Sequence, residues 1–338
     1  MEDRRNRPGA WARRIVATAA LVAAVMAFVV RPAGASTTTV DLGPLIGPSN
    51  VFRDGGQSVR LGHRILWLFG DTLYPNCDPV CASNSAGLGR AAGPGEELGA
   101  EFIPLTPAER AAWHAGDDRI AVWPMSGVRT GRSTAAVFYA RYHVAGPLDY
   151  EPLGWGIATV AVGDRVATRE LEMPGVAFGH PVRVGQWVFA FASERSGWMQ
   201  FSCKVARAPL ASLTDASAWR YWDGDGWSTD AASAAFVLPG PSGDVSVSWN
   251  RFLGQYLATY NLALSNRIEI RTAPSPTGPW SAPTTLFTGR DVPAGTFDYA
   301  GMEHPDLVRQ QGRVITVTYY HPLGAWQGEI RRVSVTLA

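Results

Sequence analysis

Short hydrophobic runs recur along the chain in pairs, and each pair is joined by a tight turn that contains glycine. In the first pair, residues 58–61 alternate polar and apolar side chains, and residues 65–69 are continuously apolar. Alternation is typical of a half-buried β-strand, and a short continuous run is typical of a fully buried one. Each pair therefore predicts a β-hairpin whose second strand is the more deeply buried. Four further pairs follow at 128–139, 181–191, 245–260 and 306–320.

The spacing of these hairpins predicts the architecture. A repeat of about 60 residues that begins with a β-hairpin is too long for a solenoid rung and matches one four-stranded blade of a propeller. Five repeats predict an all-β fold, a five-bladed β-propeller of four-stranded blades. A β-sandwich is the competing fold, but its strands show no such period. The turn glycines that mark the repeat are Gly62, Gly131, Gly185, Gly254 and Gly312.

The outer half of the repeat also recurs. Residues 204–219 and 269–280 each read as a strand, a bend at proline, and then a tryptophan, so Trp219 and Trp280 are expected to wedge between blades. Helix is expected only at 107–113, within an insertion from Glu96 to Ala115 that is interpreted as a loop excursion over one face.

The first 35 residues are predicted to be a signal peptide. Five arginines in residues 1–14 precede an uncharged run at 15–30 and the small-residue sequence Ala33-Gly34-Ala35. This order is that of a secretory signal, with cleavage expected after Ala35. The alternative is an uncleaved anchor, but the run is shorter than the roughly 20 residues that span a bilayer. Residues 36–338 are then one secreted propeller domain, expected to be a monomer without stable membrane insertion.

Composition excludes several classes of protein. The chain has 338 residues, of which 46% are hydrophobic, and this rules out disorder. A formal net charge of +1 gives no electrostatic footprint for nucleic acid. The sequence contains no GxSxG motif, HExxH motif, glycine-rich phosphate loop or metal-binding cysteine pattern, so no cofactor or metal is expected.

The three cysteines are interpreted in the light of export. Cys77 and Cys81 flank a short segment with a proline, and we expect them to form a disulfide that closes this loop. A zinc site would need four ligands, and no further Cys or His pair lies at a suitable spacing. Cys203 lies in a predicted strand and is expected to be a buried free thiol.

Two aspartates are the candidate catalytic residues. Asp54 and Asp71 are equidistant from the turn between Gly62 and His63, so an antiparallel ladder places them opposite each other at one end of the first hairpin. Carboxylates this close raise one pKa, which suits general acid or base catalysis. The alternative for each residue alone is an ordinary turn aspartate.

The same symmetry predicts other residues around that end of the propeller. His304 and Tyr320 are equidistant from Gly312, and Asp244 and Asn261 are equidistant from the fourth turn. Glu303 is a third candidate carboxylate, either the acid or a rim charge. Trp123, Trp249 and Tyr74 lie near predicted strand ends, where they would stack on sugar rings or else pack between blades. The residues expected to bind substrate are His180, Trp249, Asn250, Glu303, His304 and Tyr320.

Several of these segments resemble a secreted family known as domain of unknown function 4185. The resemblance rests on residues 54–58, 66–72, 247–250 and 303–305, and it runs from about Asp54 to the C-terminus. That family is related to five-bladed propeller glycoside hydrolases, and some members are endo-D-arabinanases of glycoside hydrolase family 183. The resemblance implies cleavage of D-arabinan in mycobacterial-type cell walls, with Asp54 and Asp71 as the catalytic positions. Related propeller families add a carboxylate from a third blade, where this chain has His180.

Three functions remain open at this point. The first is a secreted glycoside hydrolase that cleaves a furanosyl polysaccharide, endo-acting on D-arabinan, with Asp54 and Asp71 as a pair. The second is a non-catalytic carbohydrate-binding propeller. The third is a lyase in which His304 or Tyr320 is the base. Retention of configuration is expected if the two aspartates are the whole pair, and inversion if the acid comes from the opposite side.

Overall fold

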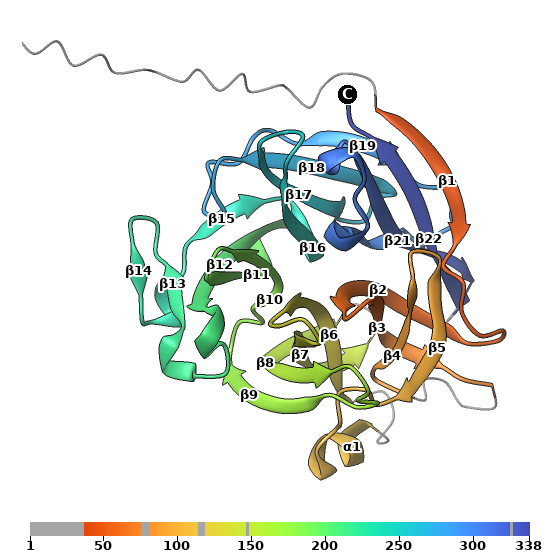
Figure 1. Cartoon of the computed structure of the whole chain (residues 1–338), viewed down its shortest axis with the longest axis horizontal. Helices are drawn as coiled ribbons and strands as arrows, with labels where there is room; N and C mark the ends of the chain where they lie inside the picture. The colour runs from red at the N-terminus through yellow and green to blue at the C-terminus, as the bar shows by residue number, and fades with distance from the viewer. Residues whose placement is uncertain (1–36, 76–81, 114–118, 147–148, 325–326) are drawn as a thin grey trace, which may run out of the picture. The chain divides into compact units, whose positions relative to one another are not determined.

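Five antiparallel β-sheets surround a common centre in the computed structural model, which describes residues 37–75, 82–113, 119–146, 149–324 and 327–338 (Figure 1). The predicted five-bladed β-propeller is confirmed. Four sheets have four strands, and the third sheet is extended to six. Blade one consists of β2 (Phe52–Leu61), β3 (Arg64–Leu73), β4 (Ser85–Arg90) and β5 (Gly93–Ala100). Blade two consists of β6 (Arg119–Arg129), β7 (Thr134–Gly146), β8 (Asp149–Ala161) and β9 (Thr168–Pro174).

The remaining blades follow in chain order around the ring. Blade three consists of β10 (Gly179–Val184), β11 (Trp187–Gly197), β12 (Gln200–Pro209), β13 (Arg220–Trp222), β14 (Trp227–Ser228) and β15 (Phe236–Pro239). Blade four consists of β16 (Pro241–Asn250), β17 (Gln255–Leu262), β18 (Arg267–Ala273) and β19 (Thr284–Thr288). Blade five consists of β20 (Tyr299–Glu303), β21 (Val314–Gly324), β22 (Gln327–Thr336) and β1 (Thr38–Pro44).

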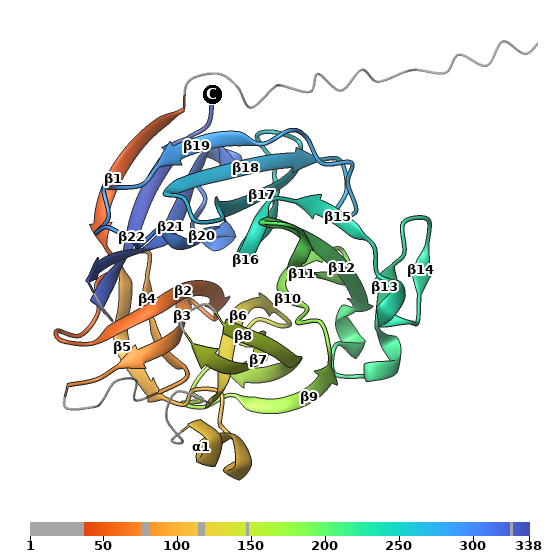
Figure 2. The same cartoon turned by 180° about the vertical axis from the view of Figure 1, so that it is seen from behind.

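The ring is closed by its first strand. β1 pairs antiparallel with β22, so Thr38 lies opposite Thr336, and Figure 2 shows the two strands side by side. Closure leaves the last blade with a complete sheet and no open junction between the first and last repeats. The described part of the chain therefore forms one ring rather than two half-rings.

Hydrophobic burial explains the predicted hairpins. The apolar run Leu66–Phe69 on β3 is fully buried, because this second strand packs against a neighbouring blade on each face. Trp219 meets Trp155 of blade two with ring centroids 4.9 Å apart, and Trp280 meets Phe191 of blade three at 6.4 Å. Both tryptophans therefore pack between blades, as the repeat predicts.

The fifth hairpin differs from its prediction. Its inner strand is β20, Tyr299–Glu303, and the segment at 306–309 is not a strand. Short 3-10 turns at Pro305–Leu307 and Gln310–Gly312 replace the expected two-residue turn. The longer turn shifts the register, so Tyr299 rather than His304 lies opposite Tyr320.

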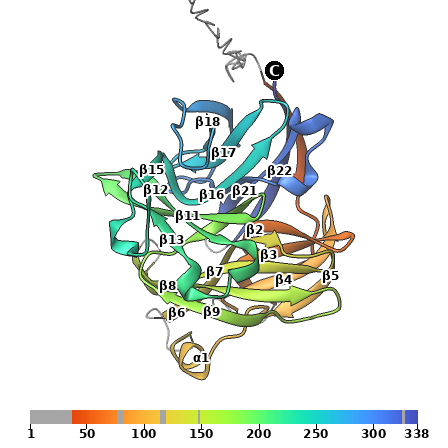
Figure 3. The same cartoon turned by 60° about the vertical axis from the view of Figure 1, so that its left-hand side comes forward.

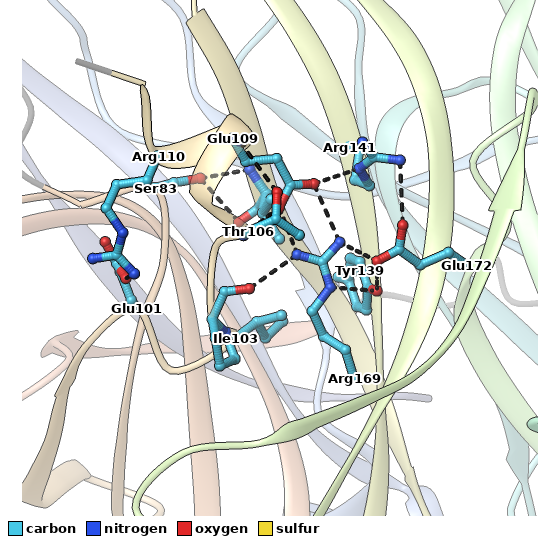
Figure 4. A network of polar contacts seen from close by, with 12 residues as sticks. Ser83, Glu101, Ile103, Thr106, Glu109, Arg110, Tyr139, Arg141, Arg169 and Glu172 are labelled. Carbon is cyan, nitrogen blue, oxygen red and sulfur yellow. Dashed lines mark hydrogen bonds and ion pairs between the residues drawn. The ribbon is translucent and has the colours of Figure 1, made fainter. Parts of the chain in front are cut away.

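The insertion between blades one and two is an ordered structure. Its first residues, Glu96 to Ala100, belong to β5, so the expectation of a loop over that part is wrong. The predicted helix is confirmed as α1 (Pro107–Trp113), which lies outside the blades in Figures 1 and 3. Glu109 of α1 is buried between two arginines of blade two, Arg141 at 2.6 Å and Arg169 at 2.6 Å (Figure 4). These ion pairs attach the helix to the blade.

Some expectations fall on residues that the structure does not describe. The signal peptide at 1–35 and both cysteines of the predicted disulfide, Cys77 and Cys81, lie outside the described residues, and these remain predictions. Cys203 is described, and it is a buried free thiol, as expected. Among the described helices, none has the length and apolar character that crossing a bilayer requires.

Candidate active site

The inner strand of each blade runs in the same direction along the centre of the ring. On β2, Asp54 lies near the start of the strand, and Leu61 lies at the hairpin turn. On β16, Asp244 lies near the start and Asn250 at the turn. We call the end where inner strands begin the mouth end, and the end with the inner turns the turn end.

Asp54 and Asp71 meet at the mouth end of blade one. Arg53 pairs with Thr72, and irregular pairing between Arg53 and Gln57 bends β2 just after Asp54. Gly55 and Gly56 both have positive φ angles, +81° and +91°, which glycine tolerates best. The bend turns the Asp54 carboxylate toward the backbone N–H of Asp71, from which it accepts a hydrogen bond. The predicted proximity of the two aspartates is therefore present.

Blade two holds the Asp71 carboxylate through both oxygens. Trp123 Nε1 donates a 2.7 Å hydrogen bond to Oδ1, and Arg119 Nη2 donates one of 3.1 Å to Oδ2. Arg119 in turn lies over the ring of Trp113, the last residue of α1, at 5.0 Å. Burial raises the pKa of Asp71, while the Trp123 bond and the Arg119 charge oppose that rise. Asp71 is the member of the pair with a cationic partner.

Asp54 has neutral donors and acidic neighbours. Tyr299 of blade five donates a 3.0 Å hydrogen bond to Oδ2. Burial, with the charges of Asp71 and Asp244, raises the pKa of Asp54 to about 8, against the opposing hydrogen bonds from Tyr299 and the Asp71 backbone. The donors on Asp71 favour its ionised form and no cation among the described residues contacts Asp54, so the pair favours a proton on Asp54 beside an arginine-bound Asp71.

A third carboxylate faces this pair from blade four. Gln57 Nε2 of blade one donates a 3.2 Å hydrogen bond to Asp244 Oδ1. The same oxygen lies 3.9 Å from Nε2 of His180 on blade three. Burial raises the pKa of Asp244 to about 6, opposed by the bond from Gln57. Asp244 and His180 therefore extend the mouth-end site across the ring.

Aromatic rings line the mouth end beside the carboxylates. The ring centroid of Trp123 lies 5.2 Å from that of Tyr142 and 6.1 Å from that of Tyr150, and the centroids of the two tyrosine rings are 5.5 Å apart. On the other side, Tyr299 and Tyr320 lie 4.6 Å apart. Trp123 and Tyr142 are half-buried and Tyr150 is exposed, so this cluster presents ring surface to solvent. Apolar sugar faces stack on surfaces of this kind.

The other predicted binding residues lie toward the turn end. Glu303 accepts a 2.6 Å hydrogen bond from Ser248, and burial raises its pKa to about 7 against that bond. A cavity of about 570 Å³ is lined by His180, Trp249 and Glu303, among others. A second cavity of about 420 Å³ is lined by Trp249, Asn250 and Glu303, among others.

His304 and Asn250 are engaged inside the fold. His304 is 1% exposed, and its ring nitrogens each lie 2.7 Å from a hydroxyl oxygen, those of Ser58 and Thr318. The Asn250 side chain donates to the carbonyl of Gly312 and accepts from the backbone N–H of Leu253. The six residues expected to bind substrate are thus divided: Tyr320 and His180 adjoin the carboxylates, and Trp249, Asn250, Glu303 and His304 lie deeper or at the turn end.

Three residues of the site were not singled out from the sequence. Arg119, Tyr299 and Gln57 each touch a candidate carboxylate. Gln57 lies on the first predicted hairpin, and its position on the strand could have indicated that its side chain points toward the centre of the ring. Arg119 and Tyr299 come from the starts of other blades, so only the closed ring brings them close. Among the described residues, no group of three or more His, Cys, Asp or Glu side chains is arranged to hold a metal ion.

The sequence matches a described family over its second half. Residues 163–324 match the family described as Domain of unknown function (DUF4185). The resemblance was expected from about Asp54, so the match covers the later part of that range and leaves Asp54 and Asp71 outside it. None of the curated proteins compared with the chain matches it.

Solved structures share the fold at low sequence identity. A Bacteroides ovatus protein provisionally described as a hydrolase is 15% identical with a TM-score of 0.60, over 87% of each chain. A family 117 glycoside hydrolase from Zobellia galactanivorans is 9% identical with a TM-score of 0.56, over 90% of this chain and 91% of that one. The exo-β-1,3-galactanase of Phanerochaete chrysosporium is 12% identical with a TM-score of 0.56, over 88% of this chain and 63% of that one. Likeness at this level shows the fold alone.

Proposed function

We propose that this protein is a secreted glycoside hydrolase whose catalytic centre is the carboxylate site at the mouth end. The observation that carries the proposal is the pairing of Asp54, whose pKa is raised to about 8, with Asp71, which Arg119 holds. Glycosidases need one carboxyl group that is protonated at working pH and another that is ionised. Asp54 supplies the protonated carboxyl group, and the contacts of Asp71 favour its ionised form.

Asp54 would act as the general acid. A protonated carboxyl donates its proton to the glycosidic oxygen as the bond to the anomeric carbon breaks, and the developing positive charge on the sugar is stabilised by nearby carboxylates. Asp71 stabilises that charge from the same hairpin. Trp123 and Tyr142 supply ring surface on which the sugar would lie.

The substrate class follows from two supports. Two similar folds belong to named glycosidases, a family 117 glycoside hydrolase and an exo-β-1,3-galactanase whose structure holds β-1,3-galactotriose. The sequence resembles a family with endo-D-arabinanases, so we propose D-arabinan of mycobacterial-type cell walls, cleaved internally. The mature enzyme would begin at Ser36, outside the cell and in the cell envelope.

One assay tests the proposal. Purified protein is incubated with arabinogalactan, D-arabinan, L-arabinan and galactan, and new reducing ends and product lengths are measured. Release of D-arabinan oligomers of several lengths supports endo-acting hydrolysis. Binding without new reducing ends would favour the carbohydrate-binding alternative, and unsaturated products would favour a lyase. The lyase interpretation has less support, because both ring nitrogens of His304 are already engaged. N-terminal sequencing of protein from the culture medium tests the cleavage site.

A further inference from the structure

We propose that Asp244 is the carboxylate that activates the attacking water, and that His180 positions this water beside it. The inference rests on the proposed hydrolase activity and adds a third residue to it. It places the base on blade four, across the ring from Asp54 on blade one.

The contacts of Asp244 fit a residue held ready for reaction. Gln57 Nε2 fixes one carboxylate oxygen at 3.2 Å, and the side chain keeps 24% of its surface exposed. No arginine or lysine forms an ion pair with it among the residues that the structure describes. Its negative charge contributes to raising the pKa of Asp54, Tyr142 and Tyr150, so the carboxylate faces the mouth-end site and its aromatic cluster.

His180 supplies the argument for water. Its side chain is almost completely buried, and its Nε2 has no hydrogen-bond partner among the described residues. The backbone of Met125 forms a hydrogen bond with the ring, and burial lowers the pKa of His180 to about 3, so the ring is neutral. With its proton directed at Met125, the ring presents the lone pair of Nε2 toward Asp244.

Two acceptors therefore face each other. Nε2 of His180 and Oδ1 of Asp244 are 3.9 Å apart, too far for a direct hydrogen bond and unsuited to one because neither carries a proton. A molecule that donates two hydrogen bonds satisfies both, and a water oxygen about 2.8 Å from each atom fits this separation. His180 also has φ of +46°, a conformation rare for residues other than glycine and often found at functional sites.

The chemical step balances with these residues. Asp244 takes one proton from the water as the water oxygen forms a bond to the anomeric carbon. The bond from that carbon to the glycosidic oxygen breaks, its electron pair stays on the oxygen, and Asp54 donates a proton to it. The products are two hydroxyl-bearing sugars, with Asp244 protonated and Asp54 ionised, and exchange with solvent restores both. Attack from the face opposite the leaving group inverts the anomeric configuration.

The test compares three variants on a substrate that the wild type cleaves. Asp244→Ala is expected to lower kcat at least 100-fold, and added azide is expected to restore turnover by forming a glycosyl azide of inverted configuration. His180→Phe, which keeps a ring but removes Nε2, is expected to lower kcat about 10-fold with little change in KM. Asp215→Asn is the control, since Asp215 is exposed between β12 and β13 of blade three and accepts hydrogen bonds from Ser217, and it is expected to retain wild-type kcat.

The outcomes separate this inference from the proposed function. Suppose that the wild type hydrolyses the substrate and that Asp54→Asn is inactive. If Asp244→Ala then keeps more than a tenth of wild-type kcat, the role of Asp244 is overturned and the proposed function stands. Proton NMR of the first-formed product adds a second reading: a retained anomer overturns the inference, and an inverted anomer supports it. Absence of wild-type hydrolysis on every polysaccharide overturns both proposals.

Discussion

Glu109, on the helix outside blade two, and Asp54, at the mouth end of blade one, are carboxylates that the protein surrounds in opposite ways. Glu109 lies between Arg169 and Arg141 and accepts the backbone N–H of Thr106. Burial opposes its ionisation, but those bonds and charges outweigh burial and lower the pKa of Glu109 to about 2. Asp54 has a tyrosine hydroxyl and a backbone amide as donors, and its pKa is raised to about 8.

The difference separates a structural carboxylate from a reactive one. Glu109 is ionised at every physiological pH, and its charge fastens α1 to the blade. Asp54 keeps its proton until mild alkalinity, which makes that proton available for transfer. Asp71 is intermediate, because burial raises its pKa while Arg119 supplies a cation. The arrangement of cations, more than burial itself, thus distinguishes the two sites.

The largest expected effect is on catalysis. Asp54→Asn and Asp71→Asn should each lower kcat by about 10²–10⁴-fold, because they remove the acid and the carboxylate beside it. Glu109→Gln should leave the kcat of the folded enzyme near that of the wild type. Steady-state kinetics on the cleaved polysaccharide measures all three. If either aspartate variant keeps more than about a tenth of wild-type kcat, that residue is not catalytic.

The next effect is on stability, and here we expect the larger change at Glu109. Glu109→Gln leaves Arg169 and Arg141 without their buried counter-charge, so we expect a loss of about 3–5 kcal/mol in the free energy of unfolding. Denaturant titration at neutral pH measures it. Glu170→Gln is the matched control, since Glu170 is exposed on β9 and bonds only a threonine hydroxyl, at 3.3 Å, among the described residues. Equal stability of the two variants would show that the Glu109 ion pairs do not hold the helix.

These contrasts also show what the sequence can predict. The five blades were predictable because each inner hairpin carries its own hydrophobic pattern and turn glycine, and so was the short helix at 107–113. The fifth hairpin was misplaced because its turn contains two 3-10 segments, and the polar and apolar residues at 306–309 imitate a strand. A pattern of polar and apolar residues indicates only which side chains are buried, and a long turn that packs on the fold can show the same pattern as a strand.

The candidate site was predictable only where symmetry about a tight turn marked a residue, as for Asp54 and Asp71 on the first hairpin and Asp244 on the fourth. Asp54 and Asp71 lie on adjacent strands joined by a tight turn, so symmetry about Gly62 placed them together. Their pKa values depend on partners from blades two, four and five, and no local pattern encodes those contacts. The symmetry rule also failed for His304, because a change of a few residues in the turn replaced it with Tyr299 opposite Tyr320.

A smaller effect is expected in the pH dependence of catalysis. With the pKa of Asp54 raised to about 8, kcat/KM should fall about tenfold per pH unit above that value as the acid loses its proton. The limb belongs to the coupled pair of Asp54 and Asp71. Tyr299→Phe removes a donor that favours the ionised form of Asp54, so the limb should move to higher pH. Tyr319→Phe serves as the control, because Tyr319 is buried away from the carboxylates. A limb near pH 5 in the wild type would exclude Asp54 as the acid.

A further effect is expected on the stability of Asp54→Asn as pH changes. The folded pKa of Asp54 is raised above the ordinary 3.8, so the stability it contributes is fully present below about pH 3.8 and is lost as pH rises through 8. Asparagine cannot ionise, so the variant should gain stability relative to the wild type over that range, because the unfolded wild-type chain ionises Asp54 while the folded chain does not. Glu109, whose folded pKa is lowered from 4.5 to about 2, has the opposite slope: its contribution is present above 4.5 and lost as pH falls toward 2. Thermal unfolding of both variants and the wild type from pH 3 to 9 measures the two slopes. If Asp54→Asn instead loses stability relative to the wild type as pH rises, Asp54 is held as a structural anion, and the distinction between the two carboxylates fails.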